Sequence, residues 1–294
     1  MDSLRTRRNP LGVHLSLFAG TTTTEAVRRA ATHARAAGYD ILELSLLAAA
    51  LNDVEGVGRA LRDHELTPTC SAGLTRDADV SSDDAEIAAR GQAVLERAVE
   101  TAAALGSTFL AGVLYGRLGA HARPAAAGDL ERAAEAIAHV AVRARDLGVT
   151  LALEPVNRYE TNLLNTAEQT LAFIDRVGQP NVVLQLDTYH AHIEEGNPAA
   201  AVRGAGGRLG YVHAGESHRG RLGTGNVDFA GFFGALADAG YSGPIVFESF
   251  SAGGPAGELA ASLSTWRDLW SDPVEVAAEA RRFLEEQLKR ASRS

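Results

Sequence analysis

Short apolar runs alternate with longer segments of helical periodicity along nearly the whole chain. The runs have the length of buried strands, and several of the segments that follow them end at a glycine, as helices often do. Strands are predicted at residues 12–18, 41–46, 66–74, 108–114, 150–154, 182–187, 209–213 and 244–248. Helices are predicted at residues 24–37, 52–64, 81–105, 129–147, 166–177, 197–205, 228–239 and 272–290.

Strands that are each followed by a helix predict one α/β domain, a (β/α)8 TIM barrel over residues 11–294. Such alternation gives parallel strands with right-handed crossovers, and eight units close a barrel. A doubly wound open sheet is the alternative. A Gly-x-Gly-x-x-Gly run after the first strand would favour that sheet, and the sequence has none there.

Composition and charge narrow the classes of function. The chain has a net charge of −9, which argues against nucleic acid as a partner because nucleic-acid binding needs a basic face. The one cysteine, Cys70, suits a reducing cytoplasm, where we expect the protein to act. The one lysine, Lys289, lies near the C-terminus, which disfavours Schiff-base chemistry because that chemistry needs a buried lysine.

The N-terminus is predicted to be a disordered basic tail over residues 1–10. An export signal is the alternative, but the apolar run that follows is short, contains His14 and is followed by no small-residue cleavage site. No apolar run approaches the ~20 residues of a membrane helix, so no membrane is expected as a partner.

The last four predicted strands end alike, because Glu154, Asp187, His213 and Glu248 each follow an apolar run. Active sites of TIM barrels are built at the C-terminal ends of the strands, so these side chains are expected to converge. An acid at a single strand end is more often a cap or an ion-pair partner. Several carboxylates together are costly unless they bind a cation, and this oxygen-rich set suits Mn²⁺, Mg²⁺ or Co²⁺.

Further polar groups follow the same strands. Arg158 and Glu160 follow the fifth strand, His190 the sixth and Arg219 the seventh. Carboxylate, imidazole and guanidinium groups beside a divalent cation suit a polyhydroxylated ligand, that is, a sugar. A surface ion pair is an equally good interpretation of Arg158. Glu43, at the end of the second strand, either supports the metal ligands or is simply a carboxylate at the barrel rim.

Several linked motifs occur in one order along the chain. They are Leu153-Glu-Pro-Val-Asn-Arg-Tyr-Glu-Thr-Asn-Leu-Leu-Asn-Thr166, Leu186-Asp-Thr-Tyr-His-Ala-His-Ile-Glu-Glu195, Tyr211-Val-His-Ala-Gly-Glu-Ser-His-Arg-Gly220, Gly223-Thr-Gly-Asn-Val-Asp-Phe229 and Phe247-Glu-Ser-Phe250. Together they resemble the ketose 3-epimerases, a group of xylose-isomerase-like barrels that includes the D-tagatose, D-allulose and L-ribulose 3-epimerases.

The resemblance implies a role for each matched residue. The implied metal ligands are Glu154, Asp187, His213 and Glu248, with Mn²⁺ as the expected metal and Co²⁺ or Mg²⁺ as alternatives. Sugar binding near C1 to C3 would fall to Glu160, His190 and Arg219, and the rest of the pocket to His14, Tyr115 and Phe250. Implied substrates are free ketoses in the pairs D-fructose/D-allulose, D-tagatose/D-sorbose and L-ribulose/L-xylulose. Relatives of this kind imply a homodimer or homotetramer.

Epimerisation at C3 requires removal of a proton beside a carbonyl and return of a proton to the other face. The hypothesis is that Glu154 and Glu248 perform these two transfers and exchange roles with the direction of reaction, while the metal stabilises the enediolate. The nearest alternative is another isomerase on the same barrel, acting on hydroxypyruvate, an aldose–ketose pair or a keto-inositol. A metal-dependent endonuclease is opposed by the net charge, and a non-catalytic sugar-binding barrel by the presence of both glutamates.

Overall fold

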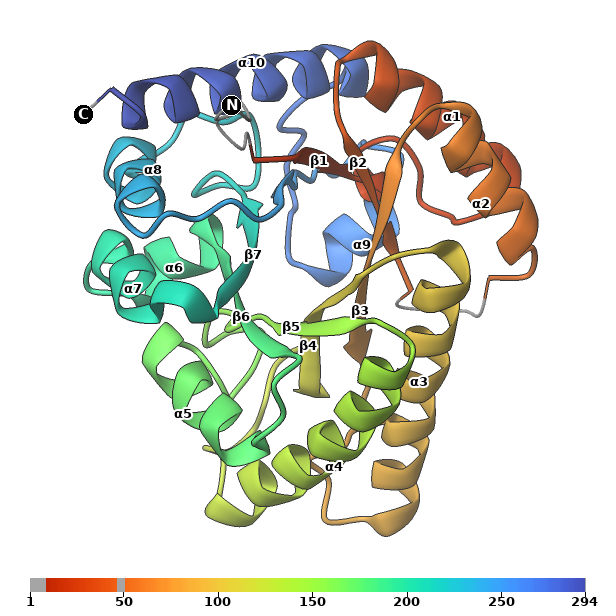
Figure 1. The fold of residues 1–294 in the computed structure, drawn as a ribbon, viewed down its shortest axis with the longest axis vertical. Coiled ribbons are helices and arrows are strands. Elements are labelled where there is room, and N and C mark those ends of the chain that lie inside the picture. The colour runs from red at the N-terminus through yellow and green to blue at the C-terminus, as the bar shows by residue number, and fades with distance from the viewer. Residues whose placement is uncertain (1–8, 47–50, 294) are drawn as a thin grey trace, which may run out of the picture.

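Parallel strands close into a barrel in chain order from β1 to β8, and helices surround them (Figure 1). The structure is a computed structural model that describes residues 9–46 and 51–293. The strands are β1 Leu11–His14, β2 Ile41–Ser45, β3 Thr67–Leu74, β4 Phe109–Arg117, β5 Thr150–Leu153, β6 Val182–Asp187, β7 Leu209–Ala214 and β8 Ile245–Phe247. The predicted TIM barrel is confirmed.

The helices lie outside the strands, mostly where the sequence predicted them. They are α1 Thr24–Ala36, α2 Val54–Asp63, α3 Ala85–Leu105, α4 Ala127–Asp146, α5 Ala167–Val177, α6 Thr188–Glu194, α7 Pro198–Ala205, α8 Phe229–Asp238, α9 Gly257–Ser262 and α10 Pro273–Ala291. The short helices α6 and α9 were not predicted, because six or seven residues are too few to establish a helical period.

Residues 9 and 10, the last two of the predicted N-terminal tail, are the first residues that the structure describes. The tail predicted over residues 1–10 lies outside the described residues as far as position 8. Asn9 is buried and donates from Nδ2 to the carbonyl oxygens of Tyr241 and Gly243. The Pro10 carbonyl accepts from the Ile245 amide, so the chain is already paired with β8 before β1 begins.

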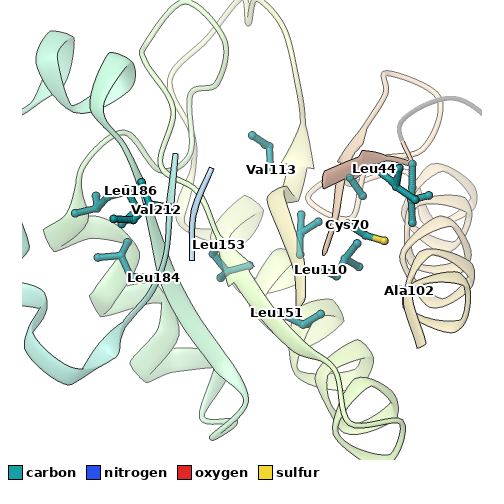
Figure 2. Close-up of a cluster of buried hydrophobic side chains, with 14 of the residues drawn as sticks. Leu44, Cys70, Ala102, Leu110, Val113, Leu151, Leu153, Leu184, Leu186 and Val212 are labelled. Carbon is teal, nitrogen blue, oxygen red and sulfur yellow. The ribbon is translucent and has the colours of Figure 1, made fainter. Parts of the chain in front are cut away.

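The apolar core lies between the strands and the helices. Leu151, Leu153, Leu184, Leu186 and Val212 belong to this layer, which Figure 2 shows on neighbouring strands. Successive residues of a strand point to opposite faces, so the residues between these leucines face the barrel interior. In the described residues no helix is long and apolar enough to cross a membrane.

A second, smaller apolar cluster fills the inside of the barrel. It consists of Ile41, Ala111, Ala152, Tyr211 and Val246, one from each of five strands. Counting two residues further along β5, β7 and β8 from these positions reaches the acids and the imidazole that the sequence analysis selected. The alternation that packs the core therefore also aims those polar groups into the barrel mouth.

Candidate functional site

Four side chains from neighbouring strands meet at the C-terminal mouth of the barrel, and they are the four expected as metal ligands. His213 Nδ1 lies 3.5 Å from Glu154 Oε1 and 3.9 Å from Asp187 Oδ2. Ligand atoms of Asp187, His213 and Glu248 lie within 4.8 Å of one another. The structure thus brings the four predicted residues into one cluster.

The cluster fits a divalent cation by the state of its donor atoms. Asp187 Oδ2 and His213 Nδ1 are buried and have no hydrogen-bond partner among the described residues. The other oxygen of Asp187, Oδ1, accepts from the Tyr189 amide at 2.6 Å and caps α6. One oxygen is therefore used to fix the carboxylate, and the other remains available to a ligand.

The raised pKa values of two carboxyl groups also indicate that the cluster lacks positive charge. Burial, followed by the Glu154 carboxylate, raises the pKa of Asp187 to about 8. Burial raises the pKa of Glu248 to about 7, although His213 and Arg219 act in the opposite direction. A bound cation would stabilise the ionised form of both carboxyl groups. It would also contact the buried oxygen and nitrogen atoms that lack a hydrogen-bond partner.

Glu43 lies behind the cluster, not at the rim. It is fully buried on β2, and its Oε2 and Oε1 atoms lie 3.0 and 3.2 Å from His213 Nε2. Although burial opposes ionisation, His213 holds the pKa of Glu43 down at about 2. Burial also opposes the charge of His213, but Glu43 and Glu154 raise the pKa of that imidazole well above its ordinary value.

One cavity joins the cluster to the predicted sugar-binding residues. Its lining residues are His14, Ser71, Ala72, Gly73, Gly112, Val113, Leu118, Glu154, Val156, Glu160, His190, His213, Arg219, Glu248, Phe250, Leu259 and Leu263. Five of the six predicted sugar contacts are among them. Leu259 and Leu263, at the short helix α9, were missed because nothing in that small-residue segment marks it as part of a pocket.

Tyr115, the sixth predicted sugar contact, is not among the residues that line this cavity. Its ring is fully buried and packs against Phe173 of α5, and its hydroxyl donates to the carbonyl oxygens of Glu154 and Leu164. The β3–β4 pairing shifts register after Val113, so the alternation along β4 does not carry through to Tyr115.

Arg219 is the arginine that lines the cavity. Nη2 lies 2.7 Å from Glu160 Oε1 and Nη1 lies 3.5 Å from Glu248 Oε2. Its guanidinium carbon sits 3.9 Å from the centre of the Tyr189 ring and 5.3 Å from that of Phe250. The backbone of Arg219 is left-handed, with φ of 62°, which is rare for a side chain of this size and typical of functional sites.

His190 is held as a hydrogen-bond donor toward the cavity. Its Nδ1 accepts from the Asn157 amide at 3.1 Å. A backbone N–H can only donate, so Nδ1 carries no proton and the neutral ring carries it on Nε2. Burial, followed by the Arg219 charge, lowers the pKa of His190 well below its ordinary value, which keeps the ring neutral. His190 can also group with Glu154 and Asp187 as a ligand, but this proton position favours contact with a ligand oxygen.

Asn157 is a polar residue of the site that the sequence analysis did not select. Its side-chain Nδ2 donates to Glu160 Oε1 at 2.9 Å and lies 3.0 Å from His190 Nδ1. It is 1% exposed and lies within the Glu154-to-Glu160 motif. The signal that could have found it is its place between two selected residues.

His14 and Arg158 complete the account of the predicted residues. His14 lines the cavity at the end of β1, with Nδ1 2.6 Å from Ser16 Oγ, and burial lowers its pKa to about 4. Arg158 lies outside the cavity and pairs with Glu194 at 2.8 Å, with 62% of its side chain exposed. The surface ion pair was therefore the correct interpretation of Arg158.

Comparison with known proteins places the chain among sugar-converting barrels. Residues 31–287 match the xylose isomerase-like TIM barrel family. The chain is 42% identical over 278 residues to a ketose 3-epimerase from Arthrobacter globiformis, covering 95% of this chain and 96% of that protein. It is 43% identical over 280 residues to an L-ribulose 3-epimerase from Methylomonas sp. (strain DH-1), covering 95% and 98%. A D-allulose 3-epimerase from Methylomonas sp., solved in complex with D-allulose, superposes with a TM-score of 0.93 at 43% identity and coverage of 96% and 98%.

Proposed function

The chain belongs to the ketose 3-epimerase family of xylose isomerase-like TIM barrels, and on this premise we propose that it interconverts free ketoses at C3 with the help of a divalent cation. The observation that carries the proposal is one cavity in which two glutamates on different strands, Glu154 and Glu248, face the same space as Arg219 and His190. Relatives named for L-ribulose, D-psicose and D-allulose support free ketoses as the substrate class. Within it we propose the pairs D-fructose/D-allulose, D-tagatose/D-sorbose and L-ribulose/L-xylulose.

The cation would be held by Glu154, Asp187, His213 and Glu248. Three carboxylates and one imidazole form an oxygen-rich set, for which we propose Mn²⁺, with Co²⁺ or Mg²⁺ as substitutes. When bound, the cation would supply Lewis-acid stabilisation of the negative charge that develops on the ketose oxygens.

The two glutamates would move the protons. Glu154 follows β5 and Glu248 follows β8, and β6 and β7 lie between them in the barrel, so they reach the cavity from different directions. One carboxylate takes the proton from C3, and the other, protonated beforehand, returns a proton to the opposite face of that carbon.

Substrate orientation would fall to Arg219, His190 and Glu160. The Nε2–H of His190 and the guanidinium of Arg219 are donors suited to the oxygens on C1 and C2, where they would polarise the carbonyl. Glu160 fixes Arg219 by the 2.7 Å ion pair and is itself held by Asn157. His14 and Phe250 would contact the remainder of the sugar.

The test uses metal-stripped protein reloaded with Mn²⁺ and incubated separately with D-fructose, D-allulose, D-tagatose and L-ribulose. Chromatography should show the C3 epimer of at least one ketose, and EDTA should abolish it. Formation of an aldose would instead assign an aldose–ketose isomerase. The expected homodimer or homotetramer stays a prediction, which light scattering of the same preparation would test.

A further inference from the structure

We propose that Glu43, held in turn by Tyr211, is a positioning residue that fixes His213 for the cation and thereby sets the affinity of the site. The inference rests on the proposed function, because it assigns a role to residues behind the metal ligands. None of the proposed catalytic steps uses Glu43 or Tyr211.

The geometry links three strands on the inside of the barrel. Glu43 on β2 reaches across to His213 on β7, with Oε2 and Oε1 at 3.0 and 3.2 Å from Nε2. The Tyr211 hydroxyl donates to Glu43 Oε2 at 2.5 Å and lies 2.8 Å from Thr69 Oγ1. Glu43 and Tyr211 are each 0% exposed, and His213 is 2% exposed, so water does not compete for these bonds.

These contacts decide which ring nitrogen can serve as a ligand. An ionised carboxylate only accepts hydrogen bonds, so Nε2 of His213 must carry the proton that points to Glu43. That leaves Nδ1 to coordinate, and Nδ1 is the atom that faces Glu154 and Asp187 without a hydrogen-bond partner among the described residues. A carboxylate behind a ligating imidazole fixes the ring and raises its basicity, and its loss typically weakens metal binding by about 10–100-fold.

Glu43 acts from behind the cluster and not as a ligand itself. The groups of described residues that could hold an ion contain Asp187 with His213 and Glu248, or with Glu154 and His190, and neither contains Glu43. Tyr211 has a second function, because its ring packs against Phe109 in the inner apolar cluster. Its hydroxyl therefore connects the barrel core to the orientation of a metal ligand.

The chain offers a matched control in Glu216. This carboxylate is also 0% exposed, but it accepts from the backbone amides of Ser217, Gly223 and Val227 and holds the loop after β7. Glu216→Gln removes a buried charge, as Glu43→Gln does, without touching His213.

The experiment measures Mn²⁺ binding by electron paramagnetic resonance of the free ion and the visible spectrum of the Co²⁺-loaded protein. We expect Glu43→Gln to weaken Mn²⁺ binding by about 10–100-fold and to alter the Co²⁺ spectrum. Tyr211→Phe should give a smaller weakening in the same direction, and Glu216→Gln should leave binding unchanged.

The outcomes separate this inference from the proposed function. Wild-type affinity and an unchanged Co²⁺ spectrum in Glu43→Gln, with normal binding by the wild type, would overturn the inference alone. Should Glu43→Gln fail to fold, an unchanged affinity in Tyr211→Phe would overturn it equally. If the wild type binds no Mn²⁺, the proposed function fails and the inference fails with it.

Discussion

The two halves of the barrel contribute different kinds of residue to the same cavity. From β5 to β8 come Glu154, His213 and Glu248, which lie at or just after the ends of their strands, and Glu160, His190 and Arg219, which lie in the segments that follow; Asp187, the last residue of β6, lies behind this lining. Strands β1 to β4 contribute mainly small and apolar lining groups, such as Ala72, Val113 and Leu118.

The half from β5 to β8, the reactive half, therefore carries most of the charged groups of the mouth, to which the proposed proton transfers fall, and the half from β1 to β4 mainly determines the shape of the cavity. His14 and Glu43 are the exceptions in the first half. Both point toward His213, with ring centroids of His14 and His213 6.5 Å apart and Glu43 bonded to its Nε2. The first half therefore contacts His213 from behind and supplies small and apolar side chains to the cavity wall.

The largest effect should come from the two glutamates of the reactive half. Glu154→Gln and Glu248→Gln are each expected to lower kcat by about 10²–10⁴-fold, because each removes a proton carrier, while Mn²⁺ binding is at least partly retained. Chromatographic rates and calorimetric titration with Mn²⁺ measure the two quantities. Near-normal turnover in either variant would contradict the two-glutamate scheme.

The next effect compares two arginines that follow strands of the same half. Arg219→Lys loses the planar contacts to Glu160 and Tyr189, so kcat/KM should fall by roughly 10–100-fold, as expected for buried charged hydrogen bonds. Arg158→Lys is the matched control and should leave kcat/KM unchanged, because the Arg158 side chain is 62% exposed and lies outside the cavity. Equal losses in both variants would remove Arg219 from the proposed substrate site.

Because Asp187 and Glu248 bind protons, the stabilisation that a bound metal gives the protein should depend on pH. The folded-state pKa values of Asp187 and Glu248, about 8 and about 7, lie above their ordinary values of 3.8 and 4.5. The folded protein therefore holds these protons more tightly than the unfolded chain, and the metal-free protein loses this stabilisation as pH rises through about 7 to 8.

A bound cation replaces those protons, so the increase in Tm that Mn²⁺ causes should be larger at pH 8 than at pH 6. Thermal unfolding with EDTA or Mn²⁺ at each pH measures it. Asp187→Asn, which removes one of the two titrating ligands, should flatten the dependence. A Tm increase that is equal at both pH values in the wild type would disagree with this electrostatic account of the cluster.

The smallest expected effect is at Tyr115, and it tests whether this residue lies in the core or in the cavity wall. Tyr115→Phe loses hydrogen bonds to the backbone outside the cavity, so we expect about 1 kcal/mol less stability and the same ranking of ketoses by kcat/KM. Phe250→Leu, a change in the cavity lining, should alter that ranking. A changed ranking of ketoses by kcat/KM in Tyr115→Phe would show that Tyr115 contributes to the substrate pocket.

The sequence predicted the barrel and the convergence of four side chains at its mouth, because an apolar run that ends in a ligand-type residue indicates both a strand and its C-terminal end. Glu154, Asp187, His213 and Glu248 share this signal. The position of Glu43 could not be read in the same way, because only the closed barrel shows that β2 brings it opposite β7. The burial of Tyr115 away from the cavity lining could not be predicted, because a register shift in the β3–β4 pairing leaves no mark in the local pattern.

The central claim is tested most directly by following the reaction of the Mn²⁺-loaded wild type in D₂O by proton NMR. The account predicts that the product is the C3 epimer of the ketose and carries deuterium at C3 in its first turnovers, because the returned proton comes from a glutamate in exchange with solvent. A C3 epimer that retains the original hydrogen, or deuterium at C1 with an aldose as product, would contradict proton transfer by two glutamates at C3.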